Sequence, residues 1–354
     1  MRIPETMRAV VKAREGRGAE LQTLPVPEAG PGEVLVRVRS CAICGTDVHI
    51  YQWNSWAAAN VAKAYSGLPR ILGHEFSGEV VGVGEGVTRV KIGDRIAAET
   101  HLPCGDCYLC RTGKGFNCQN IRRFKNGVYA EYVLIPGFSC EKLPDSVNYE
   151  IGSMLEPFSV AVHGVGKVGM VGDSVAVIGA GPIGLFTVKL ARAMGAAKIF
   201  ASDVSDYRLD LAKKAGADVV LNAGRSDVDV VKAVREGTGG LGAGVVFEIS
   251  GNVKATKQAF ELLRKCGTMV MTGLPSEPLV LDAGTDIVWK AATIYGIHGR
   301  ETFASWEISK SLLASGVVEI ESLATHRFNL FAEYEKAFEL AEKGLAGKIL
   351  LLPE

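Results

Sequence analysis

The sequence predicts an α/β protein with two domains, a small β-barrel followed by a doubly wound parallel sheet. Residues 7–99 contain short apolar segments separated by glycine and proline, a pattern typical of barrels built from short strands. From residue 172 onward, short apolar segments alternate with helix-like segments, as in a parallel sheet with helical crossovers. We therefore expect one domain over residues 1–155, to which residues 300–354 return, and a second over residues 156–299.

The composition is that of a globular protein without a strong charge preference. The 354 residues are 47% hydrophobic, which is enough to form two cores. Lysine plus arginine and aspartate plus glutamate number 39 each, so we expect neither nucleic acid nor an anionic membrane as a partner. The sequence begins without an export signal and has no apolar segment of membrane-spanning length. With eight cysteines in that context, we expect a reducing, cytoplasmic location.

Four cysteines within fifteen residues predict a structural zinc site. Their spacing is C-x2-C-x2-C-x7-C, at Cys104, Cys107, Cys110 and Cys118. Structural zinc takes four tetrahedral thiolates, and short spacings let one loop supply them all. The alternative, a set of free or disulfide-paired cysteines, does not explain why half of the chain's cysteines gather here. Such a closed site fixes a loop and does no chemistry.

Two other segments supply candidate ligands for a catalytic metal, Cys44 in the first and His74-Glu75 in the second. Taken alone, a cysteine of this kind fits a buried apolar position, and an adjacent His–Glu pair is usually structural. Catalytic zinc takes a mixed set of ligands and keeps one position open. We expect Cys44, His74 and Glu75 to form such a site if the fold brings them together.

A glycine-rich turn predicts a dinucleotide site. Gly179, Gly181 and Gly184 form a G-x-G-x-x-G motif that follows the apolar run 174–178 and precedes the helix-like segment 185–194. In this context the first glycine allows a tight turn, the second lets the backbone approach a pyrophosphate, and the third permits close packing of the helix. The N–H groups at the helix N-terminus would bind the anion.

The residue that ends the next strand predicts which dinucleotide binds. Asp203 follows the apolar segment 198–202, about twenty residues beyond Gly184. Its carboxylate would accept hydrogen bonds from the ribose hydroxyls and repel a 2′-phosphate, so we expect NAD rather than NADP. Arg208 could bind such a phosphate, but beside Asp203 we interpret it as packing along the adenosine.

These motifs together resemble the zinc-containing medium-chain alcohol dehydrogenases over nearly the whole chain. The resemblance implies an N-terminal GroES-like β-barrel catalytic domain and a Rossmann nucleotide-binding domain. Within the family, the sequence is most similar to the L-threonine 3-dehydrogenases. The segments that carry this finer similarity are 47–56 (DVHIYQWNSW), 99–101 (ETH), 295–301 (YGIHGRE) and 325–328 (THRF).

The resemblance implies a role for each matching residue. Cys44, His74 and Glu75 would bind the catalytic zinc, with Glu156 as a nearby carboxylate that can ligate or exchange with water. Thr46 and His49 match the proton relay of the family. His101 matches a residue near the substrate, although by itself it could be a surface histidine. Beside the glycines, the implied cofactor contacts are Ile183, Asp203, Arg208, Leu274, Ile297 and His298.

The implied reaction is hydride transfer from the C3 carbinol of L-threonine to NAD, which gives 2-amino-3-oxobutanoate. The alternative substrate is a polyol or vicinal diol such as sorbitol, xylitol or 2,3-butanediol. Residues 156–163 are as similar to polyol dehydrogenases as to threonine dehydrogenases. The segment between Trp56 and Gly73 is longer, and residues 120–129 are shorter, than we expect of threonine dehydrogenases.

Two other classes of protein agree less well with the residues. A zinc-free reductase relative would lack Cys44, His74 and Glu75, all of which are present. A zinc-finger nucleic-acid binder built on the four cysteines would need a basic chain, since counterion release supplies most non-specific affinity.

The segment 287–295 is apolar and strand-like near the expected edge of the second sheet. Exposed edges of this kind invite aggregation unless they are covered. The resemblance implies that two sheets pair there, so we expect a homo-oligomer, with a tetramer favoured over a dimer. The alternative is a buried strand within one subunit.

Overall fold

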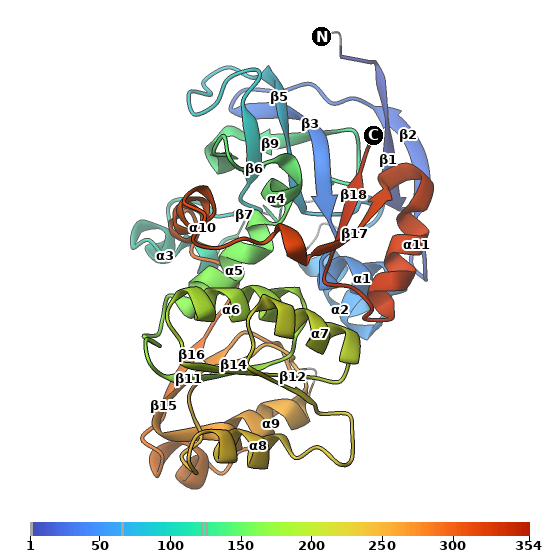
Figure 1. Ribbon diagram of the computed structural model, residues 1–354. Helices are drawn as coiled ribbons and strands as arrows, with labels where there is room; N and C mark the ends of the chain where they lie inside the picture. Colours follow the sequence, from blue (N-terminus) through green and yellow to red (C-terminus); the bar gives the residue numbers. More distant parts are fainter. Residues whose placement is uncertain (1–2, 65–66, 122, 125–126, 276) are drawn as a thin grey trace. The chain divides into compact units, whose positions relative to one another are not determined.

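The computed structural model describes residues 3–64, 67–121, 123–124, 127–275 and 277–354. The chain divides into two compact units (Figure 1). The first contains Met1–Glu156, Glu301–Ala314 and Ala324–Glu354, and the second contains Pro157–Arg300 and Ser315–Leu323. The segments of unusual length, 57–72 and 120–129, include residues 65–66, 122 and 125–126, which lie outside the described residues.

The first unit consists mainly of β-structure. Its strands are β1 (Thr6–Lys12), β2 (Glu20–Pro25), β3 (Glu33–Ala42), β4 (Arg70–Ile71), β5 (Glu75–Val83), β6 (Arg95–Ala98), β7 (His101–Leu102), β8 (Arg123–Phe124), β9 (Tyr132–Pro136), β10 (Cys140–Lys142), β17 (Ala324–Asn329) and β18 (Lys348–Leu352). A seven-stranded sheet has the order β10-β6-β5-β3-β18-β17, with β9 also paired to β3. A three-stranded sheet β2-β1-β4 and the pair β7-β8 complete the unit.

Strand β3 organises this unit, because it pairs antiparallel with β5, β9 and β18. The alternation of apolar and charged residues along Glu33–Ala42 gives it one face for the core and one for polar contacts. Ala42 at its end pairs with both Glu75 of β5 and Leu350 of β18. That register places the start of the next segment, Cys44, beside the segment that carries His74 and Glu75.

Short helices pack on this β-structure. They are α1 (Gly45–Gln52), α2 (Ser55–Ala64), α3 (Tyr108–Arg111), α4 (Tyr149–Ser153), α10 (Ala304–Ala314) and α11 (Leu330–Glu342); α5 (Leu155–Val165) crosses from the first unit into the second. The Tyr51 ring of α1 stacks on the Phe338 ring of α11, with centroids 4.2 Å apart. This contact joins α1 to the C-terminal part of the chain within one apolar core.

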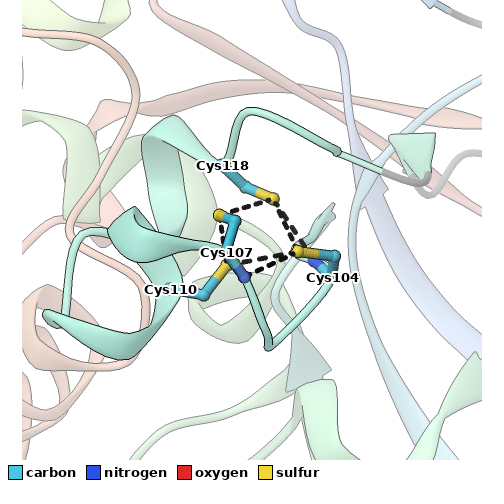
Figure 2. A group of neighbouring side chains, drawn as sticks. All are labelled: Cys104, Cys107, Cys110 and Cys118. Atoms are coloured by element: carbon cyan, nitrogen blue, oxygen red, sulfur yellow. Dashed lines mark hydrogen bonds between the residues drawn. The ribbon is translucent and has the colours of Figure 1, made fainter.

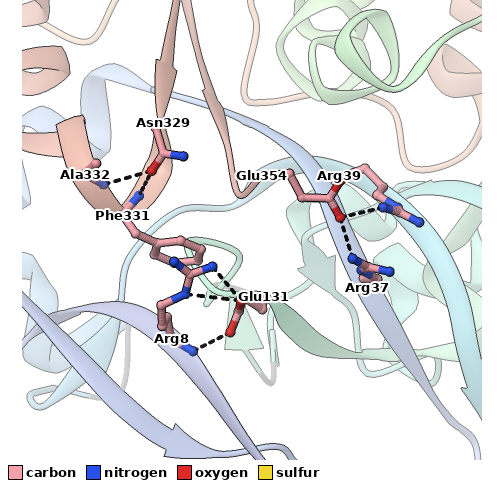
Figure 3. A network of polar contacts seen from close by, with 8 residues as sticks. All are labelled: Arg8, Arg37, Arg39, Glu131, Asn329, Phe331, Ala332 and Glu354. Carbon is pink, nitrogen blue, oxygen red and sulfur yellow. Dashed lines mark hydrogen bonds and ion pairs between the residues drawn. The ribbon is translucent and has the colours of Figure 1, made fainter. Parts of the chain in front are cut away.

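The N-terminus of α11 is held by a side-chain cap and a cation. Asn329 Oδ1 accepts hydrogen bonds from the backbone N–H groups of Phe331 and Ala332, which the helix itself leaves unpaired (Figure 3). The Arg8 guanidinium lies 4.2 Å from the centre of the Phe331 ring and forms an ion pair with Glu131 at 2.8 Å. These contacts tie α11 to β1.

The C-terminal residue is bound to the central strand of the sheet. Glu354 accepts a hydrogen bond from Arg39 Nη1 at 2.8 Å and is also paired with Arg37, both on β3 (Figure 3). Exposed ion pairs contribute little free energy of unfolding by themselves. Here two arginines converge on one carboxylate and fix the end of the strand pair β3–β18.

The second unit contains one parallel sheet with helices on both faces. Its strands are β11 (Ser174–Ile178), β12 (Lys198–Asp203), β13 (Val219–Asn222), β14 (Ala243–Glu248), β15 (Leu263–Met271) and β16 (Thr293–Gly296). Its helices are α6 (Pro182–Ala193), α7 (Asp206–Ala215), α8 (Val230–Gly237) and α9 (Val253–Leu262). Helices α6 and α7 lie on one face, and α8 and α9 lie on the other (Figure 1).

The strands have the order β13-β12-β11-β14-β15-β16. The chain therefore adds β12 and β13 on one side of β11 and then adds β14, β15 and β16 on its other side. Ligands of such sheets bind at the carboxyl ends of the strands next to this change of side. Strand β11 is fully apolar at its centre, and Val175, Ala176 and Val177 have no exposed surface. The predicted α/β class with a doubly wound parallel sheet is therefore confirmed.

The structure corrects the expectation for 287–295. Gly284–Val288 form a single π-helical turn, and only Thr293–Gly296 form a strand, β16 at the edge of the sheet. The apolar composition did not distinguish a strand from a helical turn. Helices α1 and α2 were also not predicted from the sequence. Within the described part of the chain, no helix is both long and apolar enough to cross a membrane.

Candidate active site and metal-binding loop

Helix α1 begins directly at the first candidate ligand. Cys44 is its N-cap, with extended backbone angles, and Asp47 occupies the third helical position. The Cys44 N–H donates to Asp47 Oδ2 at 3.1 Å, which satisfies a donor that the helix leaves unpaired. Cys44 is partly buried and Asp47 is fully buried. The cap therefore fixes the backbone that carries the Cys44 thiol.

The fold brings Cys44, His74 and Glu75 together. One ligand atom from each lies within 4.8 Å of the others, although Cys44 precedes the adjacent His74 and Glu75 by about thirty positions. Glu75 is completely buried, whereas Cys44 and His74 retain partial exposure. One thiolate, one imidazole and one carboxylate form a set of donors that binds zinc and leaves a coordination position open.

A glycine and an aromatic ring set the position of His74. Gly73 has φ +82°, and a Cβ there would lie 2.2 Å from a ring carbon of Tyr129. Only glycine therefore allows the Tyr129 ring to pack against the backbone beside His74. The Tyr129 hydroxyl lies 3.1 Å from Asp47 Oδ2 and 3.1 Å from the Ala42 carbonyl oxygen. The buried ring thus links β3, α1 and the His74 segment.

Asp47 is the electrostatic partner of His74. Its Oδ1 lies 3.6 Å from His74 Nδ1. Burial works to raise the pKa of Asp47, but the His74 ring and the Cys44 and Tyr129 donors outweigh it and lower the pKa below its ordinary value. Burial works to lower the pKa of His74, while Asp47 and then Cys44 raise it well above its ordinary value. The pocket therefore favours a positive charge at His74, which either a proton or a metal ion can supply.

Glu75 is buried against a lysine. Its Oε2 is paired with Lys348 Nζ, which also donates to the Ile43 carbonyl oxygen at 2.8 Å. Burial raises the pKa of Glu75 to about 7; Lys348 lowers it and Glu156 raises it. Glu75 Oε1 is buried and accepts no hydrogen bond from any residue that the structure describes. Such an orphaned oxygen suits a metal ligand, because a buried acceptor needs a partner.

Thr46 and His49 share one face of α1, because they are three positions apart. Asn54 Oδ1 accepts from the Ala57 N–H at 3.1 Å, so its amide nitrogen faces His49 Nδ1 at 2.7 Å. That orientation makes Nδ1 the acceptor and places the proton of the neutral ring on Nε2. Desolvation lowers the pKa of His49, which also favours the neutral ring.

The four remaining ligand candidates lie in one loop (Figure 2). The sulfur atoms of Cys104, Cys107, Cys110 and Cys118 converge, and four of their separations are between 3.5 and 3.9 Å. Four sulfurs arranged tetrahedrally about zinc at about 2.3 Å would be about 3.8 Å apart. The side chains point inward from α3 and from the turns on either side of it. The loop has the shape of a closed tetrathiolate site.

Backbone donors and burial shift the pKa values of Cys107 and Cys110 in opposite directions. The N–H of Cys110 lowers the pKa of Cys107 to about 6, although desolvation raises it. Desolvation and the neighbouring sulfurs raise the pKa of Cys110 to about 12. The Cys104 thiol accepts a hydrogen bond from the Cys107 N–H at 3.3 Å. The loop therefore stabilises negative charge on some of its sulfurs, and more of its thiols would become thiolates when a cation binds.

The glycine turn of the second unit has the geometry of an anion site. Gly179 has φ +97°, and a Cβ there would lie 2.9 Å from Ser250 N. A Cβ on Gly184 would lie 1.9 Å from the Gly179 carbonyl oxygen, so this position also requires glycine. A Cβ on Gly181, the N-cap of α6, would meet open space. The helix N-terminus is thus accessible to a phosphate.

Asp203 and Arg208 lie beyond this turn. Asp203 ends β12, and its two oxygens accept from the N–H groups of Ala180 at 2.8 Å and Ser205 at 2.9 Å. These bonds fix the carboxylate beside the glycine turn. Arg208 lies in the first turn of α7, and its Nε is buried without a hydrogen-bond partner among the described residues. Both polar groups are suited to contact a nucleotide.

The other predicted cofactor residues occupy different environments. Ile183 is partly buried in the first turn of α6. Leu274 is exposed, and its carbonyl oxygen lies close to Gly251 at the carboxyl end of β14. Ile297 is buried directly after β16, and the adjacent His298 is exposed. Leu274, Ile297 and His298 therefore follow the carboxyl ends of β15 and β16.

Two remaining predicted residues, His101 and Glu156, are buried in the first unit. His101 starts β7 and contacts Glu99. Glu156 lies close enough to raise the pKa of Glu75, but it is not part of the three-ligand group. Sequence reasoning gave no role to Asp47 or Lys348. Lys348 begins the apolar segment Lys348–Leu352, and a lysine that is buried with such a strand needs a carboxylate partner. This lysine was the signal in the sequence that could have indicated the pair.

Comparison with known proteins identifies the family. Residues 30–145 match the alcohol dehydrogenase GroES-like domain, and residues 182–315 match the zinc-binding dehydrogenase domain. The chain is 44% identical over 351 residues to an L-threonine 3-dehydrogenase of Caldanaerobacter subterraneus, covering 98% of this chain and 99% of that protein. It is 41% identical to a protein of the same name from Pyrococcus horikoshii, with the same coverage. The chain belongs to the zinc-binding dehydrogenase family.

Solved structures have the same fold as this dehydrogenase. A putative zinc-binding dehydrogenase from Sinorhizobium meliloti, bound to NADP, superposes with a TM-score of 0.88 at 30% identity, covering 99% of this chain and 100% of that one. The 2R,3R-butanediol dehydrogenase of Bacillus subtilis superposes with a TM-score of 0.85 at 30% identity, covering 98% and 100%. The family and the GroES-like and Rossmann architecture expected from the motifs are confirmed.

Proposed function

We propose that this dehydrogenase oxidises the C3 hydroxyl of L-threonine with NAD, giving 2-amino-3-oxobutanoate, NADH and a proton. The observation that carries the proposal is the group Cys44, His74 and Glu75, in a chain 41–44% identical over nearly its full length to L-threonine 3-dehydrogenases. The three residues would hold a catalytic metal, and the name of the relatives indicates which substrate to propose.

Cys44, His74 and Glu75 would hold the catalytic zinc, with Glu156 nearby as a carboxylate that can ligate or exchange. The orphaned Glu75 Oε1 and the surroundings that favour positive charge at His74 support this assignment. A zinc ion bound there would act as a Lewis acid toward the substrate hydroxyl and lower its pKa. Asp47 would orient His74, as carboxylates commonly do for metal-binding imidazoles.

Thr46 and His49 would carry the hydroxyl proton toward solvent. The Thr46 hydroxyl can accept one proton and donate another, and His49 is exposed on the same face of α1. The Asn54 contact holds the His49 ring in one orientation. A neutral imidazole with a lowered pKa takes up a proton only transiently, which suits a relay. His101 would lie beside the substrate.

The second unit would bind NAD. The glycine turn and the N-terminus of α6 would hold the pyrophosphate, and Asp203 would accept from the ribose hydroxyls. NAD, when bound, supplies the hydride acceptor. The residues proposed to contact the remaining parts of the cofactor are Ile183, Arg208, Leu274, Ile297 and His298.

We further propose a second, structural zinc in the loop of Cys104, Cys107, Cys110 and Cys118. Clustered free thiols suit a reducing compartment such as the cytoplasm. The domain proposal is a catalytic domain of residues 1–155 with 300–354, and a nucleotide domain of residues 156–299. Exposed Trp289 and Val288 beside the edge strand β16 support a homo-oligomer, with a tetramer favoured.

A second candidate substrate is a vicinal diol or polyol. The likeness of the chain to the 2R,3R-butanediol dehydrogenase favours it, because that neighbour has the same fold over nearly its whole length. The zinc and NAD assignments would be unchanged. Only the groups that contact the substituent next to the carbinol would differ between an amino acid and a diol.

Side-by-side kinetics test the choice of substrate. NAD reduction would be followed with L-threonine, sorbitol, xylitol and 2,3-butanediol, each before and after chelation of zinc. We expect a chelator-sensitive preference for L-threonine of about a hundredfold in kcat/KM, or roughly 2.7 kcal/mol of transition-state free energy. A comparable preference for a diol or polyol would replace threonine as the substrate.

A further inference from the structure

A buried glutamate lies at the carboxyl edge of the sheet in the second unit. Glu248 is the last residue of β14, and its side chain has no exposed surface. Strand β14 is the neighbour of β11 at the place where ligands of such sheets bind. Burying a carboxyl group is costly unless donors surround it. The groups that contact Glu248 therefore indicate what it holds in place.

The side chain of Glu248 holds the loop that follows its own strand. Its Oε1 accepts hydrogen bonds from the backbone N–H groups of Ser250 at 2.9 Å and Gly251 at 3.1 Å, and from the Ser250 hydroxyl. Burial raises the pKa of Glu248 above its ordinary value, although the Ser250 and Gly251 donors lower it. Oε1 can accept hydrogen bonds from a carboxyl group in either protonation state. The loop is therefore held whether Glu248 is ionised or neutral.

The backbone of Glu248 holds the segment that follows the neighbouring strand. Its carbonyl oxygen accepts from the N–H groups of Thr272 at 2.8 Å and Gly273 at 3.1 Å, directly after β15. Two glycines let this segment touch the loop after β14. A Cβ on Gly251 would lie 2.6 Å from the Leu274 carbonyl oxygen, and a Cβ on Gly273 would lie 2.2 Å from Gly251 N. Glu248 thus joins its own loop to the segment that contains Leu274, one of the predicted cofactor residues.

The same loop lies against the glycine turn. A Cβ on Gly179 would lie 2.9 Å from Ser250 N, so the turn and the loop are in direct contact. On its other side the turn is held without Glu248, because the Ala180 N–H donates to Asp203 Oδ2 at 2.8 Å. The side of the turn that faces β12 therefore has its own fixed contact. The side that faces β14 depends on the loop that Glu248 holds.

We propose that Glu248 is a positioning residue of the cofactor site, which fixes the loop of residues 249–252 between the glycine turn and Leu274. This inference rests on the proposed function, in which the turn holds the pyrophosphate and Leu274 contacts another part of the cofactor. A dinucleotide spans both places, so a loop that is already fixed between them raises its affinity. A mononucleotide such as 5′-AMP needs only the turn and Asp203. Because its own side chain is buried, Glu248 acts through the loop.

Nucleotide titrations test the proposal without any substrate. Affinity would be measured for 5′-AMP and for whichever of NADH and NADPH binds the unaltered protein more tightly. We expect Glu248→Ala to weaken the dinucleotide about tenfold and 5′-AMP by less than about twofold, since only the dinucleotide uses the fixed loop. The matched control is Glu261→Ala, an exposed glutamate of α9 in the same unit, which should change neither affinity. Equal losses for both nucleotides, or no loss for the dinucleotide, would overturn the proposal.

Two further variants separate positioning from a general loss of structure. Glu248→Gln keeps an oxygen that can face the loop donors, so we expect it to bind the dinucleotide within about twofold of the unaltered protein. Gly251→Ala leaves Glu248 in place but adds a Cβ at φ +63° against the Leu274 carbonyl oxygen, and it should weaken the dinucleotide. A loss in Glu248→Gln as large as in Glu248→Ala, or an unchanged affinity in Gly251→Ala, would contradict the proposal.

Hydrogen exchange measures the loop directly in the unliganded protein. We expect Glu248→Ala to speed amide exchange in residues 249–252, because the N–H groups of Ser250 and Gly251 lose their acceptor. Helix α6 should keep its exchange rates, and Glu248→Gln should restore those of the loop. Unchanged exchange of the loop in Glu248→Ala would overturn the positioning role. Absence of dinucleotide binding in the unaltered protein would instead contradict the proposed function on which the inference rests.

Discussion

The two candidate metal sites of this dehydrogenase, both of which include cysteine, are built in opposite ways. Four chemically identical ligands within residues 104–118 form one, and a single loop holds them at tetrahedral separations (Figure 2). The other takes three different ligand types from two segments that meet only because β3 and β5 pair. The first arrangement would saturate a zinc ion, whereas the second would leave a coordination position open.

The surroundings of the two sites differ as much as their ligands. The sulfurs of the loop interact mainly with one another and with nearby backbone N–H groups. At the three-ligand site, His74 lies against Asp47, and Glu75 is paired with the buried Lys348. A structural site needs only its own loop, while a catalytic site needs a second layer of charges that tunes each ligand.

The largest effect should follow from removing the thiolate of the three-ligand site. We expect Cys44→Ser to lower kcat by more than a thousandfold, since the zinc-dependent step would lose most of its acceleration. NAD affinity and the melting temperature should change little. Isothermal titration with NAD and steady-state kinetics would check this, with the exposed Cys266→Ser as the matched control. Substantial turnover in Cys44→Ser would remove the zinc assignment.

Removing a thiolate from the cysteine loop should lower the stability of the protein instead. We expect Cys107→Ser to lower both the free energy of unfolding and the zinc content, because structural zinc contributes folding energy and one lost thiolate breaks the tetrahedral set. Denaturant unfolding with zinc analysis would measure both. If melting and zinc content both stayed unchanged, the loop would not be a metal site.

Replacing Asp47 should weaken zinc binding at only one of the two sites. We expect Asp47→Asn to weaken zinc at the three-ligand site by about 10–100-fold, the usual effect of losing a carboxylate behind a metal-binding histidine. Competition with a chromophoric chelator would measure each site's affinity. Asp106→Asn, an exposed carboxylate in the cysteine loop, is the matched control and should leave both affinities unchanged. Equal effects of the two variants would argue against an orienting role for Asp47.

The smallest effect concerns the difference in reactivity between Cys107 and Cys110 after zinc is removed from the loop. The pKa of Cys107 is about 6 and that of Cys110 is about 12, so at pH 7.5 only the former is mainly thiolate. We expect alkylation to modify Cys107 several-fold faster than Cys110, and the ratio of the two rates to shrink as the pH rises above about 6, where Cys107 is already mainly thiolate while Cys110 still gains thiolate. Peptide mass spectrometry after timed alkylation would show the order. Faster modification of Cys110 would contradict it.

The contrast between the sites also explains how far the sequence could predict this molecule. The cysteine loop is local, so spacing alone predicted it, and the strand–glycine turn–helix context predicted the nucleotide fold in the same way. The donor chemistry of Cys44, His74 and Glu75 predicted them as a possible metal site, but only on the condition that the fold brings them together, because the strand register that unites them is not visible in composition or periodicity. Asp47 and Lys348 were missed for the same reason. Their partners are distant in sequence and become evident only when burial is known.

Local patterns also misled at one place. Residues 287–295 are mostly apolar and suggested a single strand, but their beginning belongs to a helical turn. Short apolar runs do not distinguish the two conformations. Helix α1 was missed because Thr46–Gln52 mixes polar and apolar residues without a clear period, and its start depends on the Cys44–Asp47 cap.

Zinc stoichiometry in three proteins tests the central claim that this dehydrogenase has two separate metal sites with different tasks. Metal analysis and turnover would be measured on the same preparations of the unaltered enzyme, Cys44→Ser and Cys107→Ser. We expect two zinc ions per chain in the unaltered enzyme and one in each variant. Turnover should be lost in Cys44→Ser without a loss of stability, and stability should be lost in Cys107→Ser. One zinc ion in the unaltered enzyme, or two retained in either variant, would contradict the central claim.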